Sequence, residues 1–359
     1  MSDKKQRVLW LTNLPAPYRL PIWETLSHYV DLKVVFTLKE KNWRDWLPPI
    51  STNWRHLYLS YRSIKIGEFV LVPNFIGAKM ILANVDTVII GGWESPMFMR
   101  TTFLANKRGL RVIHFYESTL QSHHFKNRLV NKIRSSIFSA ADFVITPGSD
   151  STQAVIAMGI PTEKIVTLFN PVDVSWFYSY AHSHRIAPMP GHRFLYVGQL
   201  IARKNVGALI EAFALIKQGE DRLLIAGDGP LVDELRATAT SLGVGDVIDF
   251  LGHKNQEELA TIYASSNTFI LPSTNEVWGL VVNEALACGL NAVVSDRCGV
   301  ANFVKQMKGV YICESTSSDI AFAMAKARDD WSGYISEPEI LKYTPKKFAE
   351  SLLELILIK

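Results

Sequence analysis

The chain has 359 residues, of which 48% are hydrophobic and 20% are charged, and this length exceeds one ordinary hydrophobic core and predicts two domains. No run of about 18 apolar residues and no apolar signal core occur, which argues against a membrane-spanning or secreted protein, so we expect a cytoplasmic one. The formal net charge is +4. Residues 1–185 contain 22 Lys and Arg against 13 Asp and Glu, whereas residues 186–359 contain 16 Lys and Arg against 21 Asp and Glu. Because no nucleic-acid-binding signature accompanies the basic half, we expect no nucleic acid as partner.

Short apolar runs rich in Val, Ile, Leu and Phe alternate with helical patterns in the first half of the chain. Six of them predict strands, at residues 8–11, 32–36, 87–90, 111–115, 143–146 and 165–168. This alternation is typical of a parallel sheet covered by helices on both faces. We therefore expect residues 1–185 to form a first Rossmann-like domain.

Polar and aromatic side chains follow several of these strands. Tyr18 and Arg19 lie in a proline-stiffened loop after the first strand, where Arg19 is available for an anionic group or the loop is merely structural. The same loop excludes a nicotinamide dehydrogenase, because LPAPYR stands where G-x-G-x-x-G would be needed. Glu117 lies at the mouth of the strand 111–115 and is a better candidate for a polar cleft residue than His114, which shares a face with Tyr116 and could be a core histidine.

Residues 123–140 combine apolar and basic positions at helical spacing. The apolar ones are Phe125, Leu129, Ile133 and Ile137, and the basic ones are Lys126, Arg128, Lys132 and Arg134. Such a helix could rest on an anionic membrane and guide a lipid-linked acceptor. The alternative is a core helix with a solvated basic back.

The strand rhythm stops at residues 173–191, where Pro188, Pro190 and Gly191 break periodicity, and then restarts. The second series of predicted strands comprises residues 194–197, 223–226, 247–251, 268–271, 292–295 and 310–312. We place a second Rossmann-like domain at residues 186–344. Residues 345–359 have helical spacing and are expected to pack back on the first domain.

The segment 271–296 carries the densest group of candidate binding residues. A strand ends at Leu271, and a helix is expected to start after a turn, so that the main-chain N–H groups of Gly279, Leu280 and Val281 form a seat for a phosphate. Glu276 lies in the turn and Glu284 about one and a half turns into the helix, where carboxylates can accept hydrogen bonds from hydroxyls. The cysteines 288, 298 and 313 lack CxxC spacing, so we expect reduced thiols and no metal.

This segment resembles the E-x7-E region of the retaining glycosyltransferases of family 4, a GT-B-fold group also called glycosyl transferases group 1. The matching residues are Glu276, Gly279, Leu280, Glu284, Ala285, Ala287, Cys288 and Gly289, with Trp278 where Phe is usual. The resemblance implies that Glu276 binds hydroxyls of a transferred sugar near the reaction centre. It also implies that Glu284 binds the ribose of a nucleotide.

Three further segments resemble the same family. In YVGQLIARKN the resemblance implies a pyrophosphate site with Gly198 and Lys204, and Arg203 could replace the charge missing where Gln199 stands for the usual Arg. In LLIAGDGPL it implies that Gly227 lets the backbone approach the nucleotide. In FLGHKN it implies a backbone contact to the base near His253, for which a solvated loop histidine is the alternative.

The resemblance implies an α/β protein of GT-B fold, with two Rossmann-like domains whose parallel sheets face each other across a deep cleft. The first domain would bind the acceptor, through Tyr18, Arg19 and Trp93, and the second a nucleotide-sugar; a core position is the alternative for Trp93. The expected reaction moves a hexosyl unit from a UDP- or GDP-sugar to an acceptor hydroxyl with retention, without a metal, in bacterial polysaccharide or glycolipid synthesis. Glu276, Glu117 and His114 are the catalytic candidates.

Two other functions are compatible with these motifs. One is a sugar-nucleotide 2-epimerase of the same fold, which needs no acceptor. The other is a catalytically silent module that binds a glycan or a nucleotide-sugar, which the presence of Glu276, Glu284 and Lys204 disfavours.

Overall fold

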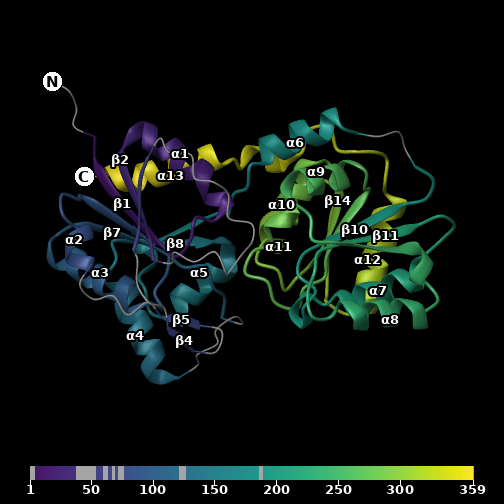
Figure 1. The fold of residues 1–359 in the computed structure, drawn as a ribbon, viewed down its shortest axis with the longest axis horizontal. Helices are drawn as coiled ribbons and strands as arrows, with labels where there is room; N and C mark the ends of the chain where they lie inside the picture. Colours follow the sequence, from purple (N-terminus) through teal and green to yellow (C-terminus); the bar gives the residue numbers. More distant parts are fainter. Residues whose placement is uncertain are drawn as a thin grey trace. The chain divides into compact units, whose positions relative to one another are not determined.

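The computed structural model describes residues 5–37, 54–59, 64–66, 69–71, 77–120, 127–185 and 189–358. The chain divides into two units (Figure 1). Unit 1 comprises Met1–Phe169 and Pro345–Lys359, and unit 2 comprises Asn170–Thr344. Each unit contains a parallel sheet with helices on both faces, so the prediction of two Rossmann-like domains is confirmed.

Unit 1 contains a sheet of seven strands in the order β3-β2-β1-β6-β7-β8-β9. All neighbouring strands are parallel, and Trp10 of β1 pairs with Val34 of β2 on one side and Ile89 of β6 on the other. The bounds are β1 Arg7–Thr12, β2 Asp31–Phe36, β3 Arg55–Tyr58, β6 Thr87–Ile90, β7 Arg111–Phe115, β8 Phe143–Pro147 and β9 Ile165–Leu168. A separate antiparallel pair is formed by β4 (Ile64–Ile66) and β5 (Phe69–Leu71).

Helices cover both faces of this sheet, which explains why its central strands β1, β6, β7 and β8 are almost entirely buried. On one face lie α1 (Leu20–Tyr29) and α13 (Pro345–Leu357), whose side chains pack on Trp10 and Phe115. The other face carries α3, α4 and α5 around a core that includes Phe98 and Phe138. The other helices of unit 1 are α2 Gly77–Ile81, α3 Pro96–Lys107, α4 Arg128–Ser139 and α5 Gly148–Ala157.

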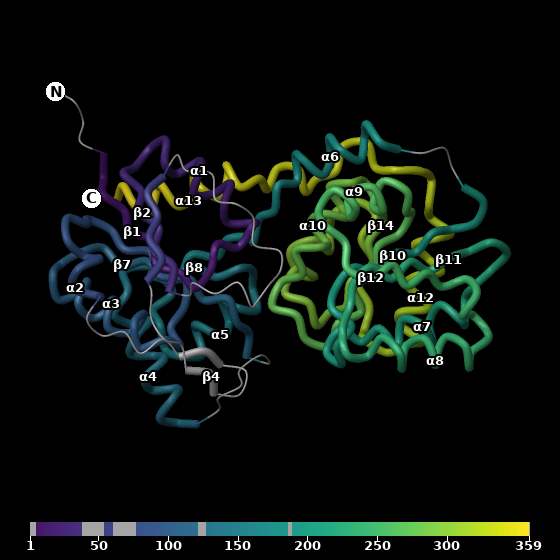
Figure 2. The backbone as a smooth tube through the Cα atoms, in the orientation of Figure 1, coloured from purple at the N-terminus to yellow at the C-terminus, as the bar shows by residue number. Residues whose placement is uncertain are grey.

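The C-terminal helix α13 belongs to unit 1, although the residues before it belong to unit 2. In Figure 2 it runs as a yellow tube beside the purple α1, and the two helices are in contact. The Phe348 ring stacks on Phe115 with centroids 6.1 Å apart, and Arg111 Nη1 donates to the Ile356 carbonyl at 2.6 Å. Both ends of the chain therefore contribute to one core.

Unit 2 contains a six-stranded parallel sheet in the order β12-β11-β10-β13-β14-β15. Helices α7, α8 and α12 cover one face, and α6, α9 and α10 lie on the other. The strands are β10 Arg193–Val197, β11 Arg222–Ala226, β12 Ile248–Gly252, β13 Thr268–Leu271, β14 Asn291–Ser295 and β15 Val310–Cys313. The helices are α6 Val174–Ser183, α7 Val206–Ile216, α8 Val232–Ser241, α9 Gln256–Ala264, α10 Leu280–Ala287, α11 Ala301–Val304 and α12 Ser317–Asp329.

The division between the units lies before α6, whereas the sequence placed it after residue 185. Helix α6 buries Val174, Phe177 and Ala181, and it packs against α9 and α10 of unit 2. The Phe177 ring lies 6.0 Å from Tyr263 of α9. The proline-rich stretch that suggested the boundary therefore follows the first helix of unit 2.

No helix in the described part of the chain is both long and apolar enough to cross a bilayer. Cys288 and Cys298 are buried free thiols, and Cys313 is a half-buried one. Burial raises the pKa of the Cys313 thiol to about 12 and raises the pKa values of the other two as well. All three are therefore protonated at neutral pH.

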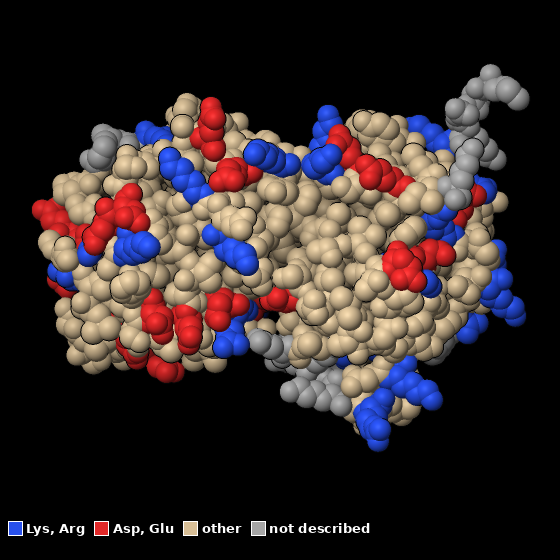
Figure 3. All heavy atoms as spheres, turned by 180° about the vertical axis from the view of Figure 1, so that it is seen from behind, with Lys and Arg blue, Asp and Glu red and all other residues tan. Residues whose placement is uncertain are grey.

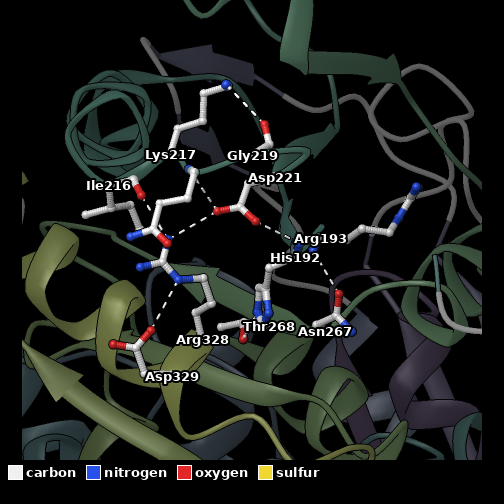
Figure 4. A network of polar contacts seen from close by, with 11 residues as sticks. His192, Arg193, Ile216, Lys217, Gly219, Asp221, Asn267, Thr268, Arg328 and Asp329 are labelled. Atoms are coloured by element: carbon white, nitrogen blue, oxygen red, sulfur yellow. Dashed lines mark hydrogen bonds and ion pairs between the residues drawn. The ribbon is translucent and has the colours of Figure 1, made fainter. Parts of the chain in front are cut away.

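A buried polar network stabilises unit 2 at the N-terminal ends of its strands (Figure 4). Asp221, only 4% exposed, accepts hydrogen bonds from the backbone of His192 at 2.8 Å and from Arg328 Nη1 at 3.1 Å. The His192 ring contacts Thr268 Oγ1 at 2.8 Å, and burial lowers its pKa to about 4. The imidazole is therefore neutral at pH 7, and Asp221 carries the charge that balances Arg328.

We expect Asp221→Ala to lower the free energy of unfolding by about 3–5 kcal/mol, because it leaves the Arg328 charge buried without its carboxylate. Denaturant unfolding followed by circular dichroism measures this. Asp329→Ala is the matched control, since the Asp329 side chain is 71% exposed and also contacts Arg328. Equal losses in the two variants would contradict the role assigned to Asp221.

Candidate active site

The strand order of unit 2 reverses between β10 and β13. The chain proceeds from β10 outward to β11 and β12, then returns to β13 on the other side of β10. Open parallel sheets bind ligands beside the C-terminal ends of the strands at such a switch point. The segments that follow β10, β11 and β13 contain six of the ten residues that the sequence nominated in unit 2, and the helix α10 contains three more.

Two glycines let the first two of these loops touch. Gly227, which follows β11, has φ +145°, and a Cβ at this residue would lie 1.8 Å from the Gly198 carbonyl oxygen. The N–H of Gly198 donates to the Ala226 carbonyl at 2.9 Å. No side chain fits at Gly227, so only glycine at this position allows the two loops to approach this closely.

Two cations converge on one carboxylate beside these loops. Lys204 Nζ is paired with Glu276 Oε2, and Arg203 Nη1 lies 3.1 Å from the same oxygen. The Lys204 side chain is 11% exposed and that of Glu276 15%, whereas that of Arg203 is 46% exposed. The structure thus places a local excess of one positive charge at the switch point.

The backbone around the cations is fixed by Asn205. This residue follows the short 3-10 helix Ala202–Lys204 and adopts a left-handed conformation with φ +58°. Its side-chain amide donates to the carbonyls of Pro272 at 3.2 Å and Ser315 at 2.8 Å. The loops after β10 and β13 are therefore tied together, which positions Lys204 against Glu276.

Helix α10 begins next to Glu276. Its N-cap is Gly279, which has φ +103°, and no side chain caps the helix start. The first helical residues are Leu280 and Val281, whose N–H groups point out of the helix end as in any α-helix. Uncapped N–H groups and the helix dipole favour an anion, as the sequence predicted for this segment.

Glu284 lies on α10 in contact with Tyr263 of α9. The Tyr263 hydroxyl donates to Glu284 Oε2 at 3.0 Å. Burial raises the pKa of Glu284 to about 7, although the hydrogen bond from Tyr263 acts in the opposite direction. Tyr263 was not among the predicted site residues, because its position in a helical pattern indicated only a core aromatic.

The raised pKa of Glu284 predicts a loss of stability as the pH rises. A carboxyl whose pKa is about 7 in the fold and 4.5 ordinarily is held better when protonated, so its ionisation removes stability as the pH rises from 4.5 through 7. We expect Glu284→Gln to raise the melting temperature above pH 7 and to leave it unchanged below pH 4.5. Thermal unfolding across pH 4–9 checks this, and an equal shift at every pH would contradict it.

His253 is exposed in the loop after β12, the strand beyond β11 at the edge of the sheet. The next residue, Lys254, forms an ion pair with Glu258 at 3.2 Å. The assignment of His253 to base binding therefore stays a prediction.

In unit 1, Arg19 and Glu117 meet at the C-terminal ends of β1 and β7. Arg19 Nη2 is paired with Glu117 Oε1, and the guanidinium lies over the rings of Tyr18 at 5.2 Å and Phe115 at 4.6 Å. The Arg19 side chain is 9% exposed and that of Glu117 is 31% exposed. Glu117 is thus the accessible member of this pair, and Tyr18 is half-buried beside it.

The nomination of His114 as a catalytic residue is wrong. Its ring is fully buried, with Nε2 2.8 Å from Thr102 Oγ1 and an edge contact to Phe138. Burial lowers its pKa to about 3, so the ring is neutral and out of reach of a ligand. His114 is thus a core residue of β7 that contacts α3.

The structure also differs from two predictions, an accessible Trp93 ring and a solvated basic side of α4. Arg134, expected on a solvated basic face, is 3% exposed and covers the Trp93 ring at 4.5 Å. One face of Trp93 is therefore occupied by a cation, and its side chain packs against the core of unit 1. Of the apolar stripe, Leu129 and Ile133 are exposed and Ile137 is buried, while residues 121–126 lie outside the described part of the chain.

No group of three or more His, Cys, Asp or Glu side chains is placed to hold a metal ion within the residues that the structure describes. The groups that carry positive charge at the switch point of unit 2 are the side chains of Arg203 and Lys204 and the N-terminus of α10.

Comparison with known proteins gives a family match in the second half of the chain. Residues 185–346 match the family model Glycosyl transferases group 1. The chain is 27% identical over 199 residues to the uncharacterized glycosyltransferase MJ1607 of Methanocaldococcus jannaschii, covering 52% of this chain and 51% of that protein. It is 30% identical over 165 residues to alpha-monoglucosyldiacylglycerol synthase of Streptococcus pneumoniae, covering 45% of this chain and 35% of that one. The chain thus matches about half or less of the length of these relatives.

The whole fold has solved counterparts. HepE of Anabaena, in a complex with UDP and glucose, superimposes with a TM-score of 0.74 over 98% of this chain and 99% of that one, at 16% identity. This similarity establishes the two-domain GT-B architecture for the chain.

Proposed function

We propose that this chain, whose residues 185–346 form a domain of the group 1 glycosyl transferases, moves a hexosyl unit from a UDP- or GDP-sugar to an acceptor hydroxyl with retention. The observation that carries the proposal is the convergence of Lys204 and Arg203 on Glu276 beside the uncapped start of α10. A diphosphate needs such a set of cations and N–H groups. A sugar attached to it needs an adjacent acceptor of hydrogen bonds.

The chemistry of transfer assigns roles to these groups. As the glycosidic bond to the phosphate breaks, positive charge develops on the sugar and negative charge on the departing diphosphate. Lys204, Arg203 and the N–H groups of Gly279, Leu280 and Val281 would stabilise the leaving group, in place of a metal ion. Before the donor binds, Glu276 neutralises part of this charge, so the diphosphate would take over the two cations from the carboxylate.

The two carboxylates would orient the donor on either side of its diphosphate. Glu276 adjoins the cations and would accept hydrogen bonds from the hydroxyls of the transferred sugar. Glu284 lies further along α10 and would accept from the ribose hydroxyls. The glycine loops at Gly198 and Gly227 would let the nucleotide approach the backbone, and His253 would lie near the base.

A donor screen tests the proposed function. Wild-type protein is incubated with UDP- and GDP-sugars and with a bacterial lipid and polysaccharide extract, and released nucleoside diphosphate and labelled product are measured. Transfer that requires both donor and acceptor, and that is lost in Lys204→Ala, supports the proposal. Conversion of the donor to an epimer without acceptor would contradict it, as would donor binding without turnover.

The acceptor would be bound by unit 1, with Tyr18, Arg19 and Trp93 as the nominated residues and Glu117 as a catalytic candidate beside them. We further propose a peripheral membrane contact through α4, which would give access to a lipid-linked acceptor. Leu129 and Ile133 are 66% and 40% exposed, and Arg128 and Lys132 are exposed beside them. In Figure 3 the lower protrusion, which is α4, carries blue side chains and no red ones.

Liposome co-sedimentation tests this contact. We expect the protein to sediment with vesicles containing anionic phosphatidylglycerol and to remain in solution with phosphatidylcholine alone. The double variant Arg128→Glu, Lys132→Glu should lose binding, because it reverses two charges beside the apolar pair. Lys305→Glu in unit 2, also exposed, is the control, and equal binding by all three proteins would contradict the proposal.

A further inference from the structure

Unit 1 has a switch point of its own. Its chain proceeds from β1 outward to β2 and β3 and returns to β6 on the other side of β1. The reversal therefore lies between β1 and β6, as it lies between β10 and β13 in unit 2. By the same rule, a ligand of unit 1 is expected at the C-terminal ends of β1 and β6.

Glu94 is the acidic side chain in the loop after β6. Its Oε2 accepts a hydrogen bond from the Trp93 backbone N–H at 2.9 Å, and its Oε1 lies 3.5 Å from Asn13 Nδ2 in the loop after β1. Asn13 Oδ1 in turn accepts from Thr37 Oγ1 at 2.8 Å, and Thr37 is 1% exposed. The buried Thr37 hydroxyl thus orients the Asn13 amide, and this amide orients the exposed Glu94 carboxylate.

The loop is shaped around this carboxylate. A Cβ at Gly92 would lie 2.7 Å from the Phe98 ring and 3.1 Å from Glu94 Oε2. A Cβ at Gly91 would lie 3.1 Å from Thr12 Oγ1 at the end of β1. A side chain at Gly92 would collide with the Phe98 ring of α3, so the loop that carries Glu94 requires glycine there.

The charge at this place selects the chemistry of the ligand. A carboxylate such as that of Glu94 accepts hydrogen bonds from hydroxyl groups and repels phosphate. Arg19, which follows β1, and Arg134, which covers the Trp93 ring, are buried with their guanidinium groups over aromatic rings. This favours a neutral polyhydroxyl group over a phosphorylated one, in contrast to the cationic switch point of unit 2.

We propose that Glu94, oriented by Asn13, binds hydroxyl groups of the acceptor and that the bound part of the acceptor is an uncharged saccharide. This inference rests on the proposed function, since it names the acceptor chemistry for the same reaction. Asn13 is a positioning residue, because it acts through Glu94. Each oxygen of the Glu94 carboxylate has a second lone pair beyond the hydrogen bond described above, and two such acceptors suit a pair of neighbouring sugar hydroxyls.

Saturation-transfer NMR with defined probes tests this proposal. The probes are the methyl glycosides of glucose, galactose, mannose and N-acetylglucosamine, each measured at millimolar concentration in the presence of UDP or GDP. We expect saturation transfer to at least one glycoside in the wild type. Glu94→Gln should weaken that binding by about tenfold or more, because a hydrogen bond to a charged group is replaced by a neutral one, and Asn13→Ala should weaken it by a smaller factor.

Glu163→Gln is the matched control, because Glu163 is exposed before β9 at the opposite end of the sheet. Its glycoside signals should equal those of the wild type, and thermal unfolding confirms that each variant is folded. Absence of glycoside signals in the wild type, or equal signals in Glu94→Gln and Glu163→Gln, would overturn the proposal. The nucleotide signals report separately on unit 2, so their presence or absence tests the proposed function independently.

Discussion

Replacing Lys204 with methionine is expected to lower kcat/KM for sugar transfer by about 10²–10³-fold, the effect typical of losing one preorganised group that stabilises a leaving oxyanion. Lys204 is almost fully buried at the switch point of unit 2 and is paired with Glu276, which lies next to Gly279 at the start of α10. Methionine keeps the length and apolar stem of lysine, so the packing should survive. Steady-state kinetics with the donor identified by screening measures the loss.

The control for this variant is Lys305→Met, which removes an exposed lysine from the same unit. It should retain the wild-type kcat/KM. If Lys204→Met were as active as Lys305→Met, the leaving-group role of Lys204 would be excluded. A loss in Lys204→Met with an unchanged melting temperature would separate this role from a purely structural one.

Glu276→Gln should change nucleotide binding and transfer in opposite directions. Without a donor, Glu276 pairs with both Lys204 and Arg203, so a diphosphate must replace a carboxylate that already neutralises these cations. Glutamine keeps the shape and removes the charge, so we expect tighter binding of free UDP or GDP. Transfer should fall by about 10–100-fold, because the hydrogen bonds from the sugar hydroxyls lose their charged acceptor.

Calorimetric titration and kinetics on the same preparation of Glu276→Gln test this pair of effects. The variant Glu257→Gln is a suitable control, because Glu257 is an exposed residue of α9. Weaker nucleotide binding together with unchanged transfer would contradict the position assigned to Glu276 next to the diphosphate.

The sequence predicted the strands well where both faces of a sheet are buried. The runs 111–115 and 268–271 match β7 and β13 residue for residue, because every position but the first of β7 is buried and apolar runs mark such strands. The strand β3 was missed. Its residues Arg55–Tyr58 lie at the edge of the sheet with mostly exposed side chains, so no apolar run identifies them.

The candidate site was predictable in unit 2 because its residues lie in short, ordered motifs next to strand ends. In unit 1, His114 stayed a candidate beside its alternative as a core histidine, because alternation along a strand shows which face a residue is on but not what covers that face. The pairing of Arg19 with Glu117 joins loops 98 positions apart, and Asn13 and Glu94 are 81 apart. Only the order of strands in the sheet brings such residues together.

Isothermal titration with UDP and GDP tests whether the switch point of unit 2 binds a nucleoside diphosphate. We expect one saturable site for at least one of the two nucleotides in the wild type. We also expect weaker binding in Lys204→Met and unchanged binding in Lys305→Met. Failure of both nucleotides to bind the wild type, or equal affinities in the two variants, would contradict this expectation.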